Sequence, residues 1–331
     1  MPIPLALLRQ IQSSPAVEAW QAILNCAWEI CAQPLEKKNA VAAVTRRDRE
    51  VAALDLFLAA AGWDLWTAFD QSVEHTADAL ANWWQAQTGG RAVLILDALS
   101  LREASLILSG AAERGYKVSP RVTAAELPAD TTQFARALGF SQRSSLANNG
   151  AGSAHRLDGA RTETVDWNWA DCANLIKAEQ RWVLWHHWPD SRVHDFAAAG
   201  QGVNALTEDA VAKLTGDDFW LLIERFTTGR NLVITSDHGY AATGLFPDSS
   251  DEQQAKFLKD VFKSGRWTQI DAQVPVNHAL PPLDLTLTTR QGAHRFVLGR
   301  RKWKSQGGYP TLAHGGLSLL EALSPFIELS R

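Results

Sequence analysis

The chain has 331 residues, 46% of them hydrophobic, and a formal net charge of −4 at pH 7. This length allows one large α/β domain or two smaller domains with a substantial core. The net charge excludes a strongly basic protein that coats nucleic acid, although it is compatible with local basic patches.

The cysteines and the first residues of the chain indicate which cellular compartment to expect. Cys26, Cys31 and Cys172 have no zinc-ribbon spacing, so we expect reduced, buried thiols rather than disulfides. The segment MPIPLALLRQ has no basic stretch, and its apolar run ends at Arg9, so we expect no conventional signal peptide. No apolar stretch is long enough to span a bilayer. We therefore expect a cytoplasmic protein with no membrane partner.

The first part of the chain has a helical pattern and little chemistry. Apolar residues recur at helical spacing over 16–31, and further helical stretches are expected at about 49–61 and 76–87. A Gly-Gly pair then ends the pattern. We expect a helical N-terminal module over residues 1–88 and a second domain over 89–331.

From residue 91 the pattern changes to that of an α/β fold. The apolar run 92–96 is typical of a central parallel strand, and it ends in Asp97. Ser100 and Glu103 then form a capping box that begins a helix. A strand, an acid and a capped helix are the opening of a βαβ unit. The next strand is expected within 116–122.

Two further apolar strands also end in an acid. The strand at 181–188 is followed by Asp190, and the strand at 232–235 is followed by Asp237. In open α/β sheets, ligands bind outside the carboxyl ends of the strands. The sequence therefore predicts a largely parallel sheet with helices on both faces, and a site at its carboxyl edge.

The other segments have few candidate functional residues. Residues 141–167 are rich in Ser, Asn, Gly and Arg, which predicts an ordered surface loop or a mobile lid. Short elements complete the chain: helices at 170–180, near Thr207, near Asp217 and at 251–263, a strand-like piece at 294–298, and a helix capped by Ser318 and Glu321 that stops before Pro325.

Thr131 lies three residues after Pro128, where a helix is expected to begin. Its hydroxyl has two interpretations. It could cap the helix, since Thr and Asp are favoured in that position. Alternatively it could be a nucleophile, because a helix N-terminus stabilises an alkoxide and binds phosphate through free amides. On the residues alone, the cap is favoured.

Carboxylates and imidazoles recur near the expected strand ends, and they could converge at one edge of the sheet: Asp97, Asp190, His194, Asp237, His238 and His314. Asp190 and His194 are four residues apart, so they meet on one face if the turn is helical. Oxygen and imidazole ligands without thiolates suit a site for two divalent metal ions, with zinc as the first choice and manganese as the second.

Five segments, in this order, resemble the alkaline phosphatase superfamily and, within it, the PglZ domain of BREX-type phage-defence systems. They are LILDALSLREA around Asp97, LPADT around Thr131, WPDSRVH from Asp190, VITSDHG around Asp237 and AHGGLSLLEAL around His314. The resemblance covers about residues 91–331. It implies an alkaline phosphatase-like fold and a metal-dependent phosphodiesterase or nuclease that acts in antiviral defence.

The resemblance also implies roles for single residues. Asp190, His194 and His314 would hold one metal ion, whereas Asp97, Asp237, His238 and the Thr131 hydroxyl would surround the second. Thr131 is preferred to Thr132 as the nucleophile because of its distance from Pro128, and its attack on phosphorus would give a phosphothreonine intermediate. This chain has Ala129 where the family more often has Ser.

Candidate phosphate-binding or substrate-binding residues are Asn149, Arg136 and Arg301. Asn149, or its neighbour Asn148, lies where similar phosphodiesterases have an Asn, and a plain turn role is the alternative. Arg301 belongs to a basic run at 300–304 that could track a polyanionic backbone or could equally be a solvated strand end.

Three functions are compatible with these residues. The first is a phosphodiesterase or nuclease, whose substrate is a phosphate ester such as a nucleic acid or oligonucleotide. The second is a phosphomonoesterase, since the metal ligands are common to both. The third is a catalytically weak scaffold component that has protein partners in a phage-defence complex.

Overall fold

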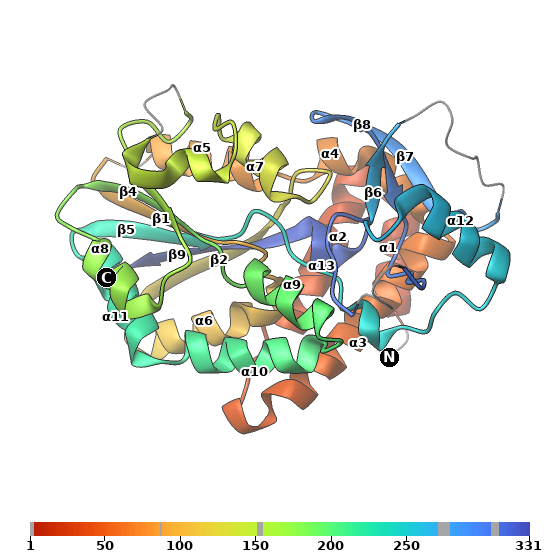
Figure 1. Ribbon diagram of the computed structural model, residues 1–331, viewed down its shortest axis with the longest axis horizontal. Helices are drawn as coiled ribbons and strands as arrows, with labels where there is room; N and C mark the ends of the chain where they lie inside the picture. Colours follow the sequence, from red (N-terminus) through yellow and green to blue (C-terminus); the bar gives the residue numbers. More distant parts are fainter. Residues whose placement is uncertain (1–2, 87, 151–154, 271–278, 306–310) are drawn as a thin grey trace.

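The computed structural model describes residues 3–86, 88–150, 155–270, 279–305 and 311–331. Within these residues the strands form two sheets, one of six strands in the order β2-β9-β5-β1-β4-β3 and one of three in the order β6-β8-β7 (Figure 1). The strands of the larger sheet are β1 (Gly90–Leu96), β2 (Lys117–Ala124), β3 (Arg161–Val165), β4 (Arg181–His186), β5 (Arg230–Thr235) and β9 (Leu323–Ser330).

The larger sheet is mostly parallel. β1 pairs in parallel with β4 and β5, and β4 pairs in parallel with β3. β9 is antiparallel to both of its neighbours, β5 and β2. The predicted α/β fold with a largely parallel sheet is therefore confirmed.

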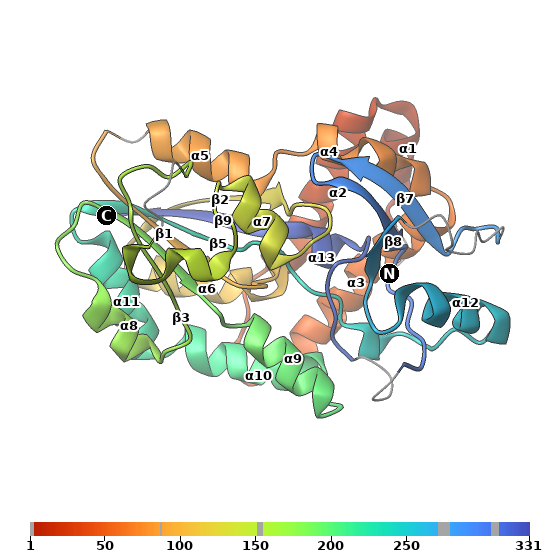
Figure 2. The same cartoon turned by 45° about the horizontal axis from the view of Figure 1, so that its top comes forward.

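Helices cover both faces of this sheet because its central strands are apolar on both sides. Alternate residues of β1 point to opposite faces, as the period of two requires. Leu94 packs in a core with α6 (Leu101–Glu113), α8 (Trp169–Leu175), α10 (Val203–Leu214) and α11 (Asp217–Thr227). Val93 packs on the other face with α5 (Thr76–Ala86) and α7 (Thr131–Ala137). Figures 1 and 2 show these two layers of helices.

The N-terminal helices share a core with the C-terminal part of the chain. The helices are α1 (Leu5–Ser13), α2 (Ala16–Cys31), α3 (Ala40–Ala60) and α4 (Phe69–Ser72), with short 3-10 turns at η1 (Lys37–Asn39) and η2 (Trp63–Ala68). Trp20 of α2 and Leu54 of α3 belong to one hydrophobic cluster with Phe296 and Leu320. The division into domains at residues 1–88 and 89–331 stays a prediction.

The smaller sheet lies beside these helices (Figure 2). Its strands are β6 (Trp267–Gln269), β7 (Asp284–Thr289) and β8 (Gly292–Val297), and they are paired antiparallel. The remaining elements are α9 (Asp190–Ala198), η4 (Thr243–Leu245), α12 (Glu252–Phe262) and α13 (Leu319–Ala322). In Figure 1 the end of antiparallel β9 lies at the far side from α2 and α3, so the parallel strands end toward these helices.

Two of the segments that differ from the prediction form strands of the larger sheet. Residues 141–167 include η3 (Arg143–Asn149) and the edge strand β3, whose sequence RTETV lacks the apolar run of a central strand. The chain also continues after α13 as β9, through Pro325. A proline argues against a central strand, but Pro325 lies beyond the stretch of β9 whose backbone pairs with β5, and its partner in the strand register is Val122 of β2.

Among the described residues, no single helix is both long and apolar enough for a membrane span. The segments Lys37–Ala60 and Trp63–Ser72, which meet at a 91° bend, satisfy that test jointly by length and composition only. Cys26, Cys31 and Cys172 are free thiols. Cys31 and Cys172 are buried, as predicted, whereas Cys26 is only partly buried.

Candidate metal centre

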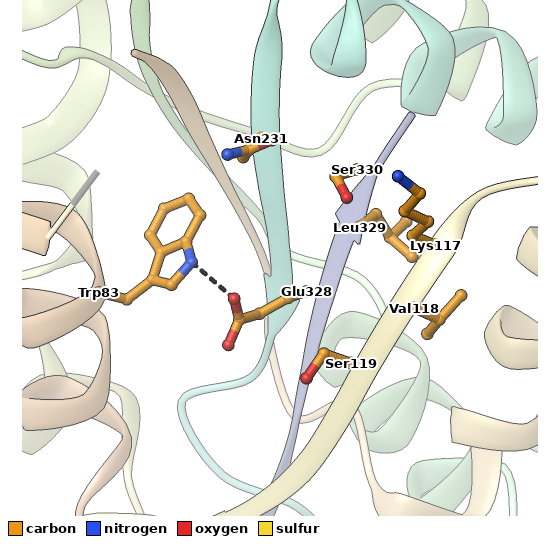
Figure 3. Close-up of a pocket in the computed structure, with 8 residues that line it drawn as sticks. All are labelled: Trp83, Lys117, Val118, Ser119, Asn231, Glu328, Leu329 and Ser330. Carbon is orange, nitrogen blue, oxygen red and sulfur yellow. Dashed lines mark hydrogen bonds between the residues drawn. The ribbon is translucent and has the colours of Figure 1, made fainter. Parts of the chain in front are cut away.

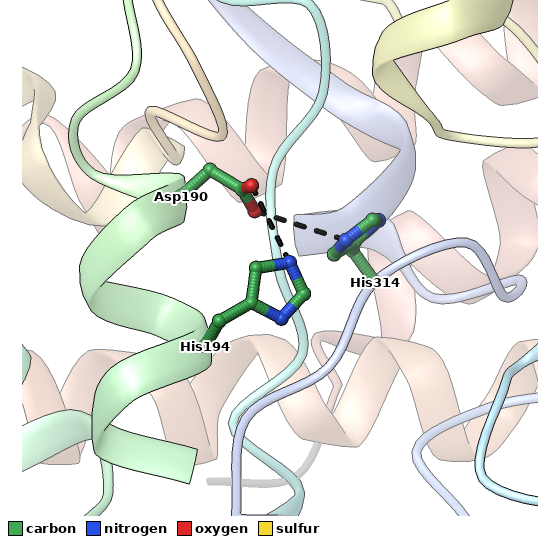
Figure 4. Close-up of side chains that lie close together, drawn as sticks. All are labelled: Asp190, His194 and His314. Carbon is green, nitrogen blue, oxygen red and sulfur yellow. Dashed lines mark ion pairs between the residues drawn. The ribbon is translucent and has the colours of Figure 1, made fainter. Parts of the chain in front are cut away.

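Three neighbouring strands deliver acids to one place. Asp97 follows the end of β1, Asp190 begins α9 after β4, and Asp237 follows the end of β5. The sheet order places β1 between β4 and β5, so their carboxyl ends are adjacent. His314 approaches from the turn before α13, and Figure 4 shows it facing Asp190 across a gap.

Asp190, His194 and His314 form the first cluster, in which one ligand atom of each lies within 4.8 Å of the others (Figure 4). Nε2 of His194 lies 3.4 Å from one Asp190 oxygen, and Nε2 of His314 lies 3.7 Å from the other. His194 is one helical turn after Asp190 on α9, and its side chain is 65% exposed. The first cluster is therefore open to solvent on the His194 side.

Asp97, Asp190 and His238 form the second cluster by the same criterion. Nε2 of His238 lies 3.8 Å from Asp97 Oδ1 and 3.5 Å from Asp237 Oδ2. Asp237 is held beside the cluster, because its Oδ1 accepts a 2.9 Å hydrogen bond from the amide of Ala98. Asp190 belongs to both clusters, whereas the sequence resemblance implied that it serves one metal ion.

Backbone carbonyls orient two of the imidazoles. Nδ1 of His238 lies 2.9 Å from the carbonyl oxygen of Gly239, and Nδ1 of His314 lies 3.1 Å from that of Ala129. A carbonyl oxygen only accepts, so Nδ1 carries the proton in each ring, and Nε2 keeps its lone pair for a ligand. The two rings are stacked with centroids 4.3 Å apart. Both imidazoles are therefore held in the tautomer that binds metal through Nε2.

Three buried atoms in or beside the clusters support a cation. Among the described residues, Asp190 Oδ1, Asp237 Oδ2 and His238 Nε2 are buried and have no hydrogen-bond partner. Buried polar atoms without partners are costly, and native structures rarely keep them without a reason. A cation between the carboxylates and imidazoles would satisfy all three. The donor set of oxygen and imidazole nitrogen fits a divalent metal ion.

The pKa shifts in the clusters also support a bound cation. Burial, together with the charges of Asp237 and Asp190, raises the pKa of Asp97 well above its ordinary value, and Arg143 only partly offsets this. Burial lowers the pKa of His238, but the charges of Asp237 and Asp190 outweigh it, so the pKa is raised. Several acids thus repel one another in a buried space, and added positive charge would relieve that repulsion.

Thr131 lies next to the second cluster. Its Oγ1 donates a 3.3 Å hydrogen bond to Asp97 Oδ1. The helix cap is Asp130, whose side chain accepts from the amide of Thr132, so the interpretation of Thr131 as the cap is wrong. Asp130 caps the helix because its extended backbone lets the carboxylate reach back to the free amides. The Thr131 hydroxyl is left for Asp97, and its role as a nucleophile stays a prediction.

Arg143 is a site residue that sequence reasoning missed. This first residue of η3 forms an ion pair with Asp97, and its side chain is 26% exposed. It occurs in a segment that reads as a loop, 46 residues from its partner, and no motif surrounds it. Only the fold could reveal the contact.

Among the described residues, the three candidate phosphate-binding residues make no hydrogen bond or ion pair with the two clusters. Asn149 has a φ of +56°, and its side chain accepts a 3.1 Å hydrogen bond from the amide of Thr162, which is a turn role. Arg136 is exposed on α7, and Arg301 is half-buried. In the described part of the chain, neither arginine contacts the two clusters. Their binding of substrate stays a prediction.

A cavity at the other edge of the sheet is separate from these clusters. It has a volume of about 170 Å³ and is lined in part by Trp83, Lys117, Asn231 and Glu328 (Figure 3). Asn231 and Lys117 lie at the starts of β5 and β2, whereas Asp237 follows the end of β5. Trp83 donates a 2.9 Å hydrogen bond to Glu328 across it. This cavity therefore does not belong to the candidate site.

No family model matches the chain, and no curated protein matches it. Among solved structures, the chain is similar to murine ectonucleotide pyrophosphatase / phosphodiesterase 5 (ENPP5, NPP5), with 11% identity and a TM-score of 0.43 over 72% of this chain and 87% of that one. An inactive form of the same murine protein in complex with AMP gives 12% identity and a TM-score of 0.42, over the same shares of the two chains.

Proposed function

We propose that this chain is a metal-dependent phosphoric ester hydrolase of the alkaline phosphatase superfamily, with phosphodiesters as substrates and Thr131 as the nucleophile. One observation carries the proposal. The Thr131 hydroxyl is hydrogen-bonded to Asp97 beside two carboxylate–imidazole clusters. An activated hydroxyl next to a site for divalent cations is what ester hydrolysis through a covalent intermediate requires.

Each residue has a role in this proposal. Asp190, His194 and His314 would hold one divalent ion, and Asp97, Asp237 and His238 would hold the other, with Asp190 shared between the two ions. Zinc is preferred to manganese for a site rich in imidazole. Bound metal ions supply positive charge that offsets the phosphate and lowers the pKa of nearby hydroxyls. Nδ1 of His238 and of His314 keep their protons on backbone carbonyls, which fixes both rings for binding through Nε2.

The chemical step uses atoms that the structure brings together. Thr131 Oγ1, oriented by its hydrogen bond to Asp97, forms a bond to phosphorus as the bond from phosphorus to the leaving oxygen breaks, and the hydroxyl proton passes through solvent to the leaving oxygen, which departs as the alcohol. Water then cleaves the phosphothreonine and restores the hydroxyl. Arg143 contacts Asp97 and so lies beside the reacting group, where its planar fork can bind two phosphate oxygens.

The finer identity rests on the motif resemblance. The order of the five segments supports a PglZ domain and a role in BREX-type antiviral defence in the cytoplasm, with a nucleic acid or oligonucleotide as the substrate. Partner proteins of a defence complex belong to the same proposal. The phosphomonoesterase remains the second candidate, because the clusters supply the same chemistry to both classes of ester.

Hydrolysis of bis-p-nitrophenyl phosphate and p-nitrophenyl phosphate, each with zinc or manganese, tests the proposal. We expect the wild type to cleave the diester, Thr131→Ala to lose at least about a thousandfold in kcat, and Thr132→Ala, the matched control, to stay active. A preference for the monoester would favour the phosphomonoesterase. If neither ester is cleaved with either metal, the result would favour the function as a scaffold component. Full activity of Thr131→Ala would exclude Thr131 as the nucleophile.

A further inference from the structure

Helix α3 of the N-terminal region carries two buried carboxylates. Asp48 and Asp55 are two turns apart on α3, which places them on one face of the helix, and both are almost fully buried. Oδ1 of Asp48 accepts a 2.8 Å hydrogen bond from Nε of Arg102, and Oδ2 accepts a 2.6 Å bond from Arg300. Buried charges occur where partners such as these compensate them.

Arg102 connects Asp48 to the segment that carries His238. Its Nη1 donates a 2.6 Å hydrogen bond to the carbonyl oxygen of Tyr240, two residues after His238. The guanidinium also lies over the Tyr240 ring, 4.5 Å from the centroid. The Tyr240 hydroxyl donates a 2.6 Å bond to Glu103, the neighbour of Arg102 on α6. Tyr240 is therefore held at its backbone, its ring and its hydroxyl.

The same segment is joined to His314. The amide of Ala241 donates to the carbonyl oxygen of Ala313 at 2.7 Å, and the amide of Ala313 returns a 3.1 Å bond to Ala241. Ala313 immediately precedes His314. The backbone at Gly239 lies close to the backbone at Leu320, because a Cβ on residue 239 would lie 2.2 Å from the carbonyl oxygen of Leu320. A shift of Tyr240 would thus move both imidazole-bearing segments.

Asp55 acts on the chain that follows His314. Its Oδ1 accepts a 2.7 Å hydrogen bond from the amide of Leu319, the first residue of α13. Its Oδ2 accepts a 2.5 Å bond from Arg300, which also pairs with Asp48. One face of α3 therefore holds, directly or through Arg102, the chain that follows each of the two imidazoles.

Helix α3 also has an apolar face that packs in the core. Val51, Leu54 and Leu58 on the same helix are buried, and apolar residues can replace buried ion pairs with little or no loss of stability. A buried ion pair is retained for a reason other than stability when it fixes one geometry. We infer that α3 is a positioning element of the metal centre, in which Asp48 acts through Arg102 on the turn that carries Asp237 and His238. This inference rests on the proposed metal-binding function.

Zinc affinity of the metal-free protein, measured by competition with a chromophoric chelator, tests the inference. Asp48→Asn keeps the shape but removes the charge that fixes Arg102. We expect zinc binding to weaken by about 10–100-fold, as when the partners of metal ligands are removed. The absorption spectrum of the cobalt(II) form should also change, because it reports ligand geometry. A purely structural role would lower the unfolding temperature and leave that spectrum unchanged.

Asp284→Asn is the matched control. Asp284 forms a buried ion pair with Arg295 between β7 and β8 of the smaller sheet. Because this pair contacts neither cluster in the described chain, we expect zinc affinity and the cobalt spectrum of the control to match the wild type. An equal loss of affinity in Asp284→Asn would assign the effect to general loosening and overturn the inference.

Arg102→Lys covers the case in which Asp48→Asn does not fold. Lysine keeps the charge opposite Asp48, but its single ammonium cannot hold Asp48 and Tyr240 as the planar fork does. We expect the same weakening of zinc binding and the same spectral change. Wild-type affinity in the folded variants overturns the positioning role alone. Absence of zinc binding by the wild type overturns the proposed function as well, so the two failures are distinct.

Discussion

The hydroxyl of Thr131 lies 3.3 Å from Oδ1 of Asp97, although the two residues are 34 positions apart in the chain. Asp97 follows the end of β1 at the middle of the sheet, and Thr131 begins a helix that packs on one face of the sheet. The contact between Thr131 and Asp97 depends on where α7 begins. The cap of that helix therefore determines the position of the candidate nucleophile.

Asp130→Ala should both destabilise the protein and reduce its activity. The Asp130 side chain accepts a 2.9 Å hydrogen bond from the amide of Thr132. Loss of a helix cap costs about 1 kcal/mol of unfolding free energy, which urea denaturation would measure. Thr132→Ala keeps the amide and serves as the control. Unchanged stability of Asp130→Ala would show that the cap does not hold the start of α7.

Arg143→Ala should lower kcat/KM for the diester by about 100-fold or more, as expected when a charged donor to the reacting group is lost. The structural reason is its contact with Asp97, beside Thr131. Arg143→Lys should recover only part of the rate, because an ammonium cannot form the two parallel bonds of a guanidinium. Steady-state kinetics would measure both.

Arg136→Ala is the control for this effect. Arg136 is an exposed arginine on α7, the helix that begins with Thr131. It contacts neither cluster in the described part of the chain, so we expect its loss to lower kcat/KM much less than the loss of Arg143 does. Equal defects in Arg136→Ala and Arg143→Ala would mean that net positive charge near the site, rather than the Arg143 contact, is what matters.

The acids of the site could be predicted from sequence because their positions follow from the strands. Asp97, Asp190 and Asp237 each follow the end of an apolar strand, and parallel strands bring their carboxyl ends to one edge. The order of the strands in the sheet, which makes the three acids adjacent, could not be predicted from the sequence. The membership of Asp190 in both clusters depends on that order.

Other features lack a local signal. Arg143 and β3 lie in a polar segment without periodicity, and β9 contains Pro325, which a local rule excludes from a strand. In the sequence, Asp48 has the pattern of a solvated charge on a helix. Its burial depends on its pairing with Arg102, which is 54 residues away in the chain. Contacts between distant residues decide each of these cases, and the pattern of a single segment does not contain them.

Zinc should raise the unfolding temperature of the wild type, and EDTA should reverse this, because an ion that binds only the folded state stabilises it. Asp190→Asn should lose most of that shift, since Asp190 belongs to both clusters. His194→Ala should keep part of it, because His194 belongs only to the first cluster and is largely exposed. Thermal unfolding followed by circular dichroism would show the difference. The reverse ranking of the two variants would contradict the shared role of Asp190.

Stability should also depend on pH through Glu103. Burial raises the pKa of Glu103 from its ordinary value of 4.5 to about 7, despite the hydroxyl of Tyr240 and the charge of Arg102. The folded state then binds the proton more tightly than the unfolded state. The contribution of Glu103 to stability is full below pH 4.5 and is lost as the pH rises through about 7.

The Glu103→Gln variant isolates this contribution, because glutamine does not titrate. The free energy of unfolding, measured by urea denaturation from pH 4 to 8, should fall more steeply for the wild type than for the variant, by up to about 1.4 kcal/mol per pH unit within the window. Glutamine also weakens the bond to Tyr240, which lowers stability at every pH and leaves the slope unaffected. Parallel curves for the two proteins would show that Glu103 is ionised in the folded state throughout this range, held so by Arg102 at the back of the metal centre.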